Sequence, residues 1–246
     1  MRIQKFIPCN KCKDTQSPGY IFSKDDEGDE KVIRCDCWKK YQQNILLQHK
    51  LIKANIPIKT MKYDINSYVG SDVHNNLKAI KNYIIKFDKY NGWHLYFYGT
   101  YGTQKSTLLR YIGKELLIQG RSVYYVLADE LIKELIRADR EEDIRDKWNN
   151  ILQYDLLIID EMSEDKITTY QSGWQRKFIL PFLKKRLESY NKNVIFASNS
   201  PYDNIGTFFE GAIQDLIRRE VKAQLTFEDN YEEESKSFDA SSLWED

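Results

Sequence analysis

Residues 99–107 combine glycines, hydroxyl side chains and a lysine in an arrangement that could bind phosphate. In order they are Gly99, Thr100, Tyr101, Gly102, Thr103, Gln104, Lys105, Ser106 and Thr107. Turn glycines let the backbone approach an anion closely, and successive N–H groups at the start of a helix attract negative charge. Every residue of this stretch except Tyr101 is therefore a candidate for nucleotide binding. Lys105 would reach the β- and γ-phosphates, and the Ser106 hydroxyl would be a ligand of Mg²⁺.

One position departs from the usual phosphate-loop pattern G-x-x-x-x-G-K-[ST], because Gln104 stands where that pattern has a glycine. If the position requires a positive φ, a residue other than glycine costs on the order of 1 kcal/mol. The backbone N–H of Gln104 is retained, so the phosphate cradle loses no donor. We expect nucleotide binding with slow hydrolysis. The alternative interpretation is an accidental Gly-x-x-Gly turn before a helix.

Two carboxylates follow the apolar run 156–159, where the sequence continues as Asp160-Glu161. The C-terminal ends of parallel strands meet at one edge of a sheet, where ligands bind, so we expect both side chains to face the phosphate loop. Asp160 would hold Mg²⁺, directly or through water, and Glu161 would polarise the water that attacks ATP. The alternative is a helix N-terminus, at which the helix dipole favours a glutamate.

Asn199 and Arg218 complete the candidate constellation. Asn199 follows an apolar run and could orient the attacking water beside the γ-phosphate, although its Ser-Asn-Ser-Pro context also fits a simple turn. Arg218 lies in the helical pattern 213–220 and could stabilise the charge that develops during phosphoryl transfer in a neighbouring subunit. The sequence does not separate Arg218 from Arg219, and both could be solvated surface arginines. We prefer Arg218.

The cysteines of the chain fall into two close pairs, at positions 9 and 12 and at positions 35 and 37. Thiolates at such spacings can hold one tetrahedral metal ion, and four of them leave no open position for catalysis. Apolar runs at 19–22 and 31–34 flank an acidic turn, which predicts a β-hairpin that brings the pairs together. We expect a structural Zn²⁺ that supplies folding free energy to a segment with little core of its own. Its ligands would be Cys9, Cys12, Cys35 and Cys37; four ordinary reduced thiols are the alternative.

These residues need a scaffold, and the hydrophobic pattern predicts an α/β fold with a parallel sheet. Apolar runs typical of strands cover 93–98, 122–127, 154–159, 193–197 and 223–227. Helical spacing separates them, and it also occurs at 38–55 and 77–87, before the first strand. Such an alternation is typical of a sheet that helices cover on both faces. A charged helical segment at 129–153 contains many pairs of opposite charge that can stabilise a helix surface.

The composition of the chain limits the classes of protein to which it can belong. The 246 residues are 41% hydrophobic, enough for a core, and hold neither an apolar run as long as a membrane span nor a signal-peptide pattern. We expect a cytoplasmic protein with a zinc-binding N-terminal module at 1–60, an ATPase domain at 65–230 and an acidic, disordered tail at 231–246.

Charge is distributed unevenly along the chain. Residues 228–246 contain eight acidic groups and one lysine, which leaves 1–227 with 36 basic and 29 acidic residues. A basic body with an acidic tail fits a nucleic-acid partner. Within the body, the stretch 168–177 mixes aromatic and cationic side chains, as single-strand-binding surfaces do. Its candidates for DNA contact are Tyr170, Trp174, Arg176 and Lys177, although Trp174 could simply pack at the start of a helix.

Taken together, the motifs resemble the AAA+ ATPases of the DnaC/DnaI/IstB-like group. The resemblance depends on the phosphate loop, Leu-Leu-Ile-Ile-Asp-Glu at 156–161, Phe-Ala-Ser-Asn-Ser at 196–200 and Ile-x-x-Leu-Ile-Arg-Arg at 213–219. The cysteine segment is similar to the zinc-binding N-terminal part of DnaI-like and phage-encoded helicase loaders. One departure is that Tyr231 precedes three glutamates rather than an arginine, so a C-terminal arginine sensor is not expected.

The resemblance implies an ATP-dependent loader that places the replicative hexameric DNA helicase on single-stranded DNA, from a phage or mobile element. It implies ATP, Mg²⁺ and Zn²⁺ as cofactors, self-association through AAA+ interfaces, helicase binding by the N-terminal domain and no membrane partner. Two alternatives remain. One is an IstB-like transposition helper ATPase, and the other is a nucleotide-binding adaptor in which Gln104 has weakened or removed hydrolysis.

Overall fold

The computed structural model of the chain describes residues 6–13, 17–24, 26–68, 73–163, 172–207 and 209–227. The chain divides into two compact units, Met1–Ile52 and Lys53–Asp246. The predicted bounds of the N-terminal module, 1–60, and of the ATPase domain, 65–230, stay predictions. The predicted acidic tail at 231–246 lies outside the described residues.

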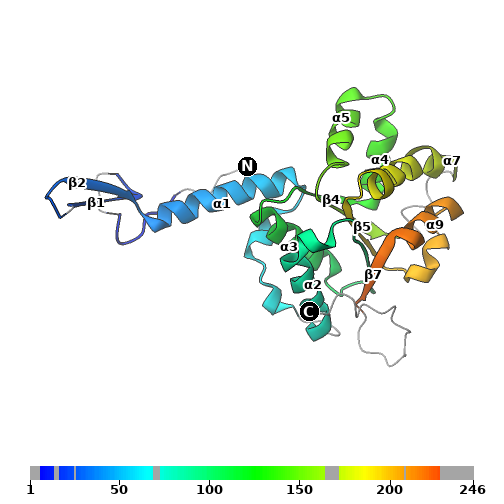
Figure 1. Ribbon diagram of the computed structural model, residues 1–246, viewed down its shortest axis with the longest axis horizontal. Helices are drawn as coiled ribbons and strands as arrows, with labels where there is room; N and C mark the ends of the chain where they lie inside the picture. Colours follow the sequence, from blue (N-terminus) through cyan, green and yellow to red (C-terminus); the bar gives the residue numbers. More distant parts are fainter. Residues whose placement is uncertain are drawn as a thin grey trace. The chain divides into compact units, whose positions relative to one another are not determined.

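The first unit contains a β-hairpin followed by a long helix (Figure 1). Strands β1, Tyr20–Lys24, and β2, Glu30–Arg34, pair antiparallel, and helix α1 covers Asp36–Lys53. The predicted hairpin is confirmed. Gly19, just before β1, has a φ of +99°, and a Cβ there would lie 3.2 Å from the ring of Trp38. A glycine is therefore needed both for the turn and for the close packing of Trp38.

The second unit is built on a five-stranded sheet in the order β4-β5-β6-β3-β7, in which every neighbouring pair is parallel. Its strands are β3 His94–Tyr98, β4 Val123–Leu127, β5 Leu156–Met162, β6 Asn193–Ser198 and β7 Val221–Thr226. All residues of β6, and all but one of β5, are buried, as expected for central strands covered on both faces. The predicted parallel α/β fold is confirmed.

Helices lie on both sides of this sheet (Figure 1). The α-helices of the second unit are α2 Val73–Ile85, α3 Lys105–Ile118, α4 Ala128–Arg137, α5 Glu142–Ile151, α7 Ser172–Trp174, α8 Leu180–Lys184 and α9 Gly211–Glu220. Two π-helical turns, η4 Gln175–Ile179 and η5 Lys185–Ser189, flank α8. Short 3₁₀ helices are η1 Ile58–Lys62, η2 Ile65–Ser67, η3 Phe87–Tyr90 and η6 Tyr202–Thr207. Helices α4, α5, α8 and α9 share one apolar core with the sheet. Within the described ranges, no helix is both long and apolar enough to cross a membrane.

The charged segment 129–153 forms α4 and α5, as the pattern predicts. Two of its ion pairs join residues four apart, Lys133 with Asp129 at 2.6 Å and Arg137 with Glu141 at 2.7 Å. Exposed pairs of this kind each contribute only a few tenths of a kcal/mol. The charges of this segment are therefore largely explained by the surface of its own helices.

A buried arginine joins the strands that carry the candidate site. Arg186 is fully buried and donates hydrogen bonds to the carbonyl oxygens of Leu152, Tyr154 and Asn193 at 2.6–2.8 Å. These carbonyls precede β5 and begin β6. Arg186 thus fixes the N-terminal ends of β5 and β6. Asp160 and Asn199 lie at the opposite, C-terminal ends of these strands.

His94, the first residue of β3, makes the stability of the second unit dependent on pH. Its side chain is fully buried, and its Nδ1 accepts a hydrogen bond from the N–H of Val194 at 3.2 Å. Burial lowers the pKa of His94 to about 4, against about 6.5 in an unfolded chain. The unfolded state therefore binds the proton more tightly, and stability present above pH 6.5 is lost as the pH falls toward 4, by roughly 3 kcal/mol.

We expect the urea midpoint of the second unit to fall steeply between pH 6.5 and 4, and a His94→Gln variant to lose less stability over the same interval. Circular dichroism across a pH series measures this. His49→Gln, which changes an exposed histidine on α1, serves as the control and should keep the wild-type slope. An acid response of His94→Gln identical to wild type would contradict the assignment.

Candidate functional site

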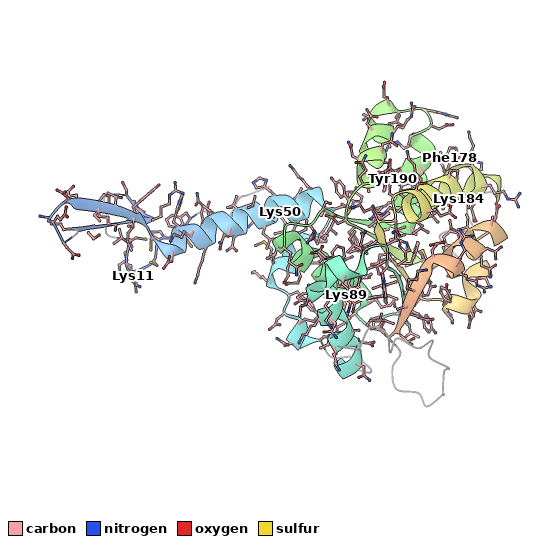
Figure 2. The ribbon with its side chains drawn as sticks, in the orientation of Figure 1. Lys11, Lys50, Lys89, Phe178, Lys184 and Tyr190 are labelled. Carbon is pink, nitrogen blue, oxygen red and sulfur yellow. The ribbon has the colours of Figure 1, made fainter. Side chains whose placement is uncertain are left out.

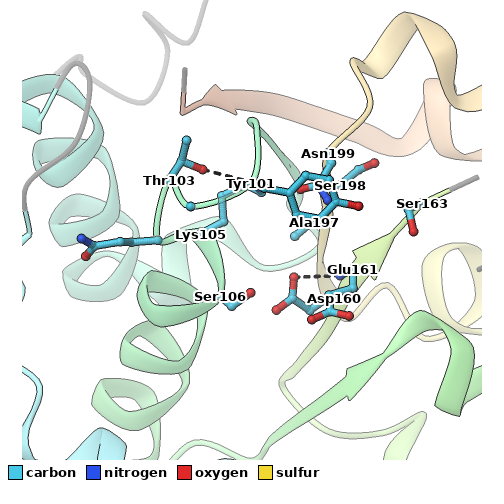
Figure 3. Close-up of a pocket in the computed structure, with 12 residues that line it drawn as sticks. Tyr101, Thr103, Lys105, Ser106, Asp160, Glu161, Ser163, Ala197, Ser198 and Asn199 are labelled. Atoms are coloured by element: carbon cyan, nitrogen blue, oxygen red, sulfur yellow. Dashed lines mark hydrogen bonds between the residues drawn. The ribbon is translucent and has the colours of Figure 1, made fainter. Parts of the chain in front are cut away.

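The phosphate-loop stretch joins β3 to α3 at the edge of the sheet where β5 and β6 also end. It borders a pocket of about 400 Å³ (Figure 3). The lining residues are Tyr101, Gly102, Thr103, Gln104, Lys105, Ser106, Asp160, Glu161, Ser163, Ala197, Ser198 and Asn199. The structure thus brings together the loop, the two carboxylates and Asn199. Gly99, Thr100 and Thr107 do not line this pocket, and their nucleotide contacts stay predictions.

Lys105 holds a positive charge inside the loop. Its side chain is largely buried, and Nζ donates to the carbonyl oxygens of Gly99 and Thr100, the latter at 2.8 Å, and to Thr103 Oγ1 at 3.2 Å. Burial lowers the pKa of Lys105, and the nearby charge of Asp160 opposes that shift. An ammonium at this place is well suited to bind phosphate oxygens, because it is charged and partly stripped of water.

Gln104 has a φ of 62° and a ψ of 17°, which places it in the left-handed region. The position therefore requires the conformation that glycine adopts freely, at a cost on the order of 1 kcal/mol for glutamine. Its carbonyl oxygen accepts hydrogen bonds from the N–H groups of Thr107 and Leu108 at 3.0 and 3.1 Å. The loop thus keeps its shape despite the missing glycine.

Gly99 has a reason to be glycine that the sequence did not reveal. A Cβ at this position would lie 2.2 Å from the carbonyl oxygen of Phe227, which follows β7. The N–H of Phe227 donates to the carbonyl oxygen of Tyr98 at 2.7 Å. The start of the phosphate loop is therefore packed directly against the backbone that follows β7.

Asp160 and Glu161 lie at an irregularity in β5 rather than after its end. The register of β5 against β6 shifts between Ile159 and Met162, and Glu161 has a φ of 57°. Asp160 is 2% exposed, and its Oδ1 accepts the N–H of Glu161 at 2.8 Å while its Oδ2 accepts the hydroxyl of Tyr125 at 2.5 Å. Such bulges re-aim side chains, and this one directs two successive carboxylates toward the loop.

The residues present fit a magnesium ion. In Figure 3, Ser106 at the start of α3 points toward Asp160 across the pocket. A serine hydroxyl and a carboxylate are oxygen ligands of the kind that Mg²⁺ prefers, and phosphate oxygens and water supply the rest of its shell. Sequence reasoning missed Ser163 and Ser198, which also line the pocket. Ser198 donates to the carbonyl oxygen of Met162 and accepts the N–H of Ser200, so it supports the turn that carries Asn199.

The structure places Arg218 away from the pocket of its own chain. It is exposed on α9, and its Nη2 donates to the carbonyl oxygen of Asp203 at 2.7 Å. With its side-chain amide turned so that the oxygen faces this guanidinium, Gln214 accepts two further hydrogen bonds from it. Arg219, in contrast, pairs with Glu188 and Glu220. The two arginines that the sequence could not separate therefore differ in their partners.

The four cysteines of the first unit converge. Their sulfur atoms all lie within 4.8 Å of one another, with separations of 3.9 Å for Cys9–Cys12, 3.6 Å for Cys9–Cys35 and 3.4 Å for Cys12–Cys37. A tetrahedral zinc with Zn–S bonds of about 2.3 Å requires sulfur separations of roughly 3.8 Å. A hydrogen bond from the Lys11 backbone and neighbouring thiols lower the pKa of Cys9 to about 7. The geometry therefore fits a structural zinc site.

The predicted DNA-contact residues that the structure describes form ion pairs or ring contacts with other residues of the same chain. Arg176 pairs with Glu210 at 2.7 Å, and Lys177 pairs with Asp139 at 3.0 Å. Trp174 is 41% exposed, and its ring centroid lies 6.0 Å from that of Phe178, labelled in Figure 2. Residues 168–171 of this stretch lie outside the described ranges. DNA contact here stays a prediction.

Two curated relatives are consistent with the family resemblance that the motifs indicate. An ATP-binding protein of insertion sequence IS5376 from Geobacillus stearothermophilus is 28% identical over 110 residues, 45% of this chain and 41% of that protein. The replicative helicase loader DnaI of Bacillus subtilis (strain 168) is 26% identical over 129 residues, 52% of this chain and 40% of that protein. The chain thus spans about two fifths of the length of these curated relatives.

A solved structure and a family match agree with these relatives. The crystal structure of the DnaC helicase loader shares the fold, with a TM-score of 0.57 at 18% identity over 69% of this chain and 98% of that one. The resemblance to the DnaC/DnaI/IstB-like group is confirmed. The bacterial DnaA ATPase domain family matches residues 61–219, which include the phosphate loop, both carboxylates, Asn199 and Arg218. The chain therefore belongs to the bacterial DnaA ATPase domain family, and its second unit is an AAA+ ATPase domain.

Proposed function

We propose that the chain is a Mg²⁺-dependent ATPase that loads a hexameric replicative helicase onto single-stranded DNA. The observation that carries the proposal is the pocket that unites Lys105 and Ser106 of the loop with Asp160, Glu161 and Asn199. The helicase-loader relative supports the partner. A protein with this role would act in the cytoplasm, together with the helicase.

Each pocket residue has a role in this proposal. Lys105 and the loop N–H groups bind the phosphates of ATP, and Ser106 and Asp160 hold Mg²⁺, which neutralises the charge on the transferred phosphoryl group. Glu161 polarises the attacking water, and Asn199 helps to orient that water. Since Gln104 keeps the loop in shape at a cost on the order of 1 kcal/mol, slow turnover is expected rather than loss of binding.

Arg218 would complete the site of a neighbouring subunit. It is exposed, and its hydrogen-bond partners among the described residues are a carbonyl and an amide, both neutral, so its charge remains available to a phosphate. Arg219 already faces two carboxylates, which favours Arg218 as the arginine that acts in trans. This role requires self-association of the ATPase domains. In the first unit, the zinc-bound hairpin and α1 would contact the helicase.

A second candidate function follows from the insertion-sequence relative. A transposition helper would use the same ATPase domain with a transposase as its partner. The cysteine cluster favours the loader, because the cluster lies within the segment that resembles zinc-binding helicase loaders. A non-hydrolysing adaptor remains the third alternative, since Gln104 occupies the left-handed position.

The test is the mass of the complex formed with the replicative helicase encoded in the same genome. We expect ATP to assemble a complex with wild-type protein that decays as ATP is consumed, whereas Glu161→Gln binds ATP, hydrolyses it on the order of 100-fold more slowly and keeps the complex. Native mass spectrometry and phosphate release measure the two effects. Glu142→Gln, which changes an exposed glutamate on α5, is the control. Equal hydrolysis by wild type and Glu161→Gln would favour the adaptor, and capture of transposase but not helicase would favour the transposition helper.

A further inference from the structure

Tyr125, on β4, connects Asp160 to a residue of the phosphate-loop helix. Its hydroxyl donates to Asp160 Oδ2 at 2.5 Å and accepts a hydrogen bond from Arg110 Nη2 at 2.9 Å. The guanidinium of Arg110, on α3, also lies 5.0 Å from the centre of the Tyr125 ring. Three elements, α3, β4 and β5, therefore meet in one hydrogen-bonded chain that ends on the candidate magnesium ligand.

The chemistry of Arg110 and Asp160 fixes which group donates and which accepts in each of these hydrogen bonds. A guanidinium has only donors, so the oxygen of Tyr125 must be the acceptor toward Arg110. The single hydroxyl proton is then free to point at Asp160, and an ionised carboxylate can only accept. Arg110 thus selects the state of Tyr125 that donates to Asp160.

The backbone of Tyr125 is also held, by two hydrogen bonds at the outer edge of the sheet. Strand β4 lies at the edge of the sheet, so its outer N–H and C=O groups are not paired by a strand. The N–H of Tyr125 donates to the carbonyl oxygen of Ala54 at 2.9 Å, and the side-chain amide of Asn55 donates to the carbonyl oxygen of Tyr125 at 3.1 Å. On the inner side, Leu127 is the register partner of Asp160. Because residues two apart share a face, Tyr125 reaches Asp160 along the same face of the sheet.

We propose that Tyr125 is a positioning residue for Asp160, and that Arg110 orients the Tyr125 hydroxyl for this role. The inference rests on the proposed Mg²⁺–ATP site and deepens it. Asp160 Oδ1 accepts the N–H of Glu161 and Oδ2 accepts Tyr125, so these two bonds together fix the plane of the carboxylate. The remaining lone pairs are then available to the metal in one orientation. Without Tyr125, the carboxylate can rotate, and the site binds Mg²⁺ less well.

The test compares Tyr125→Phe with Tyr124→Phe in the full chain. Tyr125→Phe keeps the ring and removes only the hydroxyl. Tyr124 is the neighbouring residue of β4, and its ring packs at 5.7 Å against Trp148 on the opposite face, away from Asp160. Binding of the fluorescent analogue mant-ATP is measured in EDTA and over a Mg²⁺ series. We expect Tyr125→Phe to require on the order of tenfold more Mg²⁺ for half-maximal enhancement of binding, with unchanged affinity in EDTA. Tyr124→Phe should match wild type, and Arg110→Met should shift in the same direction as Tyr125→Phe.

The outcomes separate this inference from the proposed function. If wild type binds mant-ATP in a Mg²⁺-dependent way and Tyr125→Phe shows the same dependence, the positioning role is overturned while the ATP site stands. If Tyr125→Phe loses affinity equally in EDTA and in Mg²⁺, Tyr125 acts on the fold of the pocket and the inference is overturned. If wild type shows no Mg²⁺-dependent binding at all, the proposed function fails first, and the inference fails with it.

Discussion

Replacing Lys105 with alanine should abolish ATP binding. The ammonium is the one charge among the loop residues 99–107, and it is held by the oxygens of Gly99, Thr100 and Thr103 at the place where phosphates would lie. Hydrogen bonds from a charged donor to a charged acceptor contribute about 1.5–3 kcal/mol each. Loss of contacts to two phosphate groups should therefore weaken binding by roughly 3 kcal/mol or more, which is at least about 100-fold.

Titration with mant-ATP measures this loss, and a thermal melt checks that the variant folds. Folding should survive, because alanine leaves no buried charge behind and is a strong helix former at the first residue of α3. Lys133→Ala is the matched control, since it removes an exposed lysine that pairs with Asp129 on α4. Tight ATP binding by a folded Lys105→Ala protein would show that residues 99–107 are not a phosphate loop.

Removal of zinc should unfold the first unit and leave the second intact. Every residue of β2 is exposed, and a two-stranded hairpin alone is at best marginally stable in water. Binding of a structural zinc contributes on the order of 10–16 kcal/mol, far more than the hairpin can supply from packing. We expect one zinc per chain, and we expect chelation to remove both the metal and the protection of β1 and β2 against hydrogen exchange.

Cys12→Ser tests the same point by mutation, because Cys12 is fully buried and its sulfur lies 3.4 Å from that of Cys37. The variant should lose zinc and helicase capture while its mant-ATP affinity stays within about twofold of wild type, because mutations that share no partners act independently. Ser23→Ala, at a polar residue of β1, is the control and should retain the metal. A Cys12→Ser protein that keeps β1 and β2 protected would mean that the thiols are not a structural metal site.

The sequence predicts which strands and helices form better than it predicts the backbone conformation and the contacts of individual residues. The strands and the hairpin follow from apolar runs and turn residues, whose period depends only on local geometry. Glu161 illustrates what cannot be read locally. Its left-handed backbone and the bulge in β5 arise from pairing with β6, and a glutamate gives no local signal for a positive φ.

The contacts around the site show the same limit. Gly99 looked like a glycine needed for phosphate, yet its close neighbour is the backbone of Phe227, a residue distant in sequence. In the sequence, Tyr125 is one more residue of an apolar strand. Its hydrogen bond to Asp160 is not evident there, because it depends on the register of β4 against β5. Cross-strand partners are set by tertiary packing, so one sequence reveals the type of a residue but not what it touches.

The strand order has a consequence for how the protein is made. Strand β3, which leads into the phosphate loop, pairs with β6 and β7, and both are synthesised after it. During translation β3 is therefore an apolar strand without partners until nearly all of the described chain has left the ribosome. Such non-local pairing slows folding and leaves nascent strands prone to aggregation. The phosphate loop also reaches its final packing late, because Phe227, whose backbone packs against Gly99, is among the last described residues to emerge.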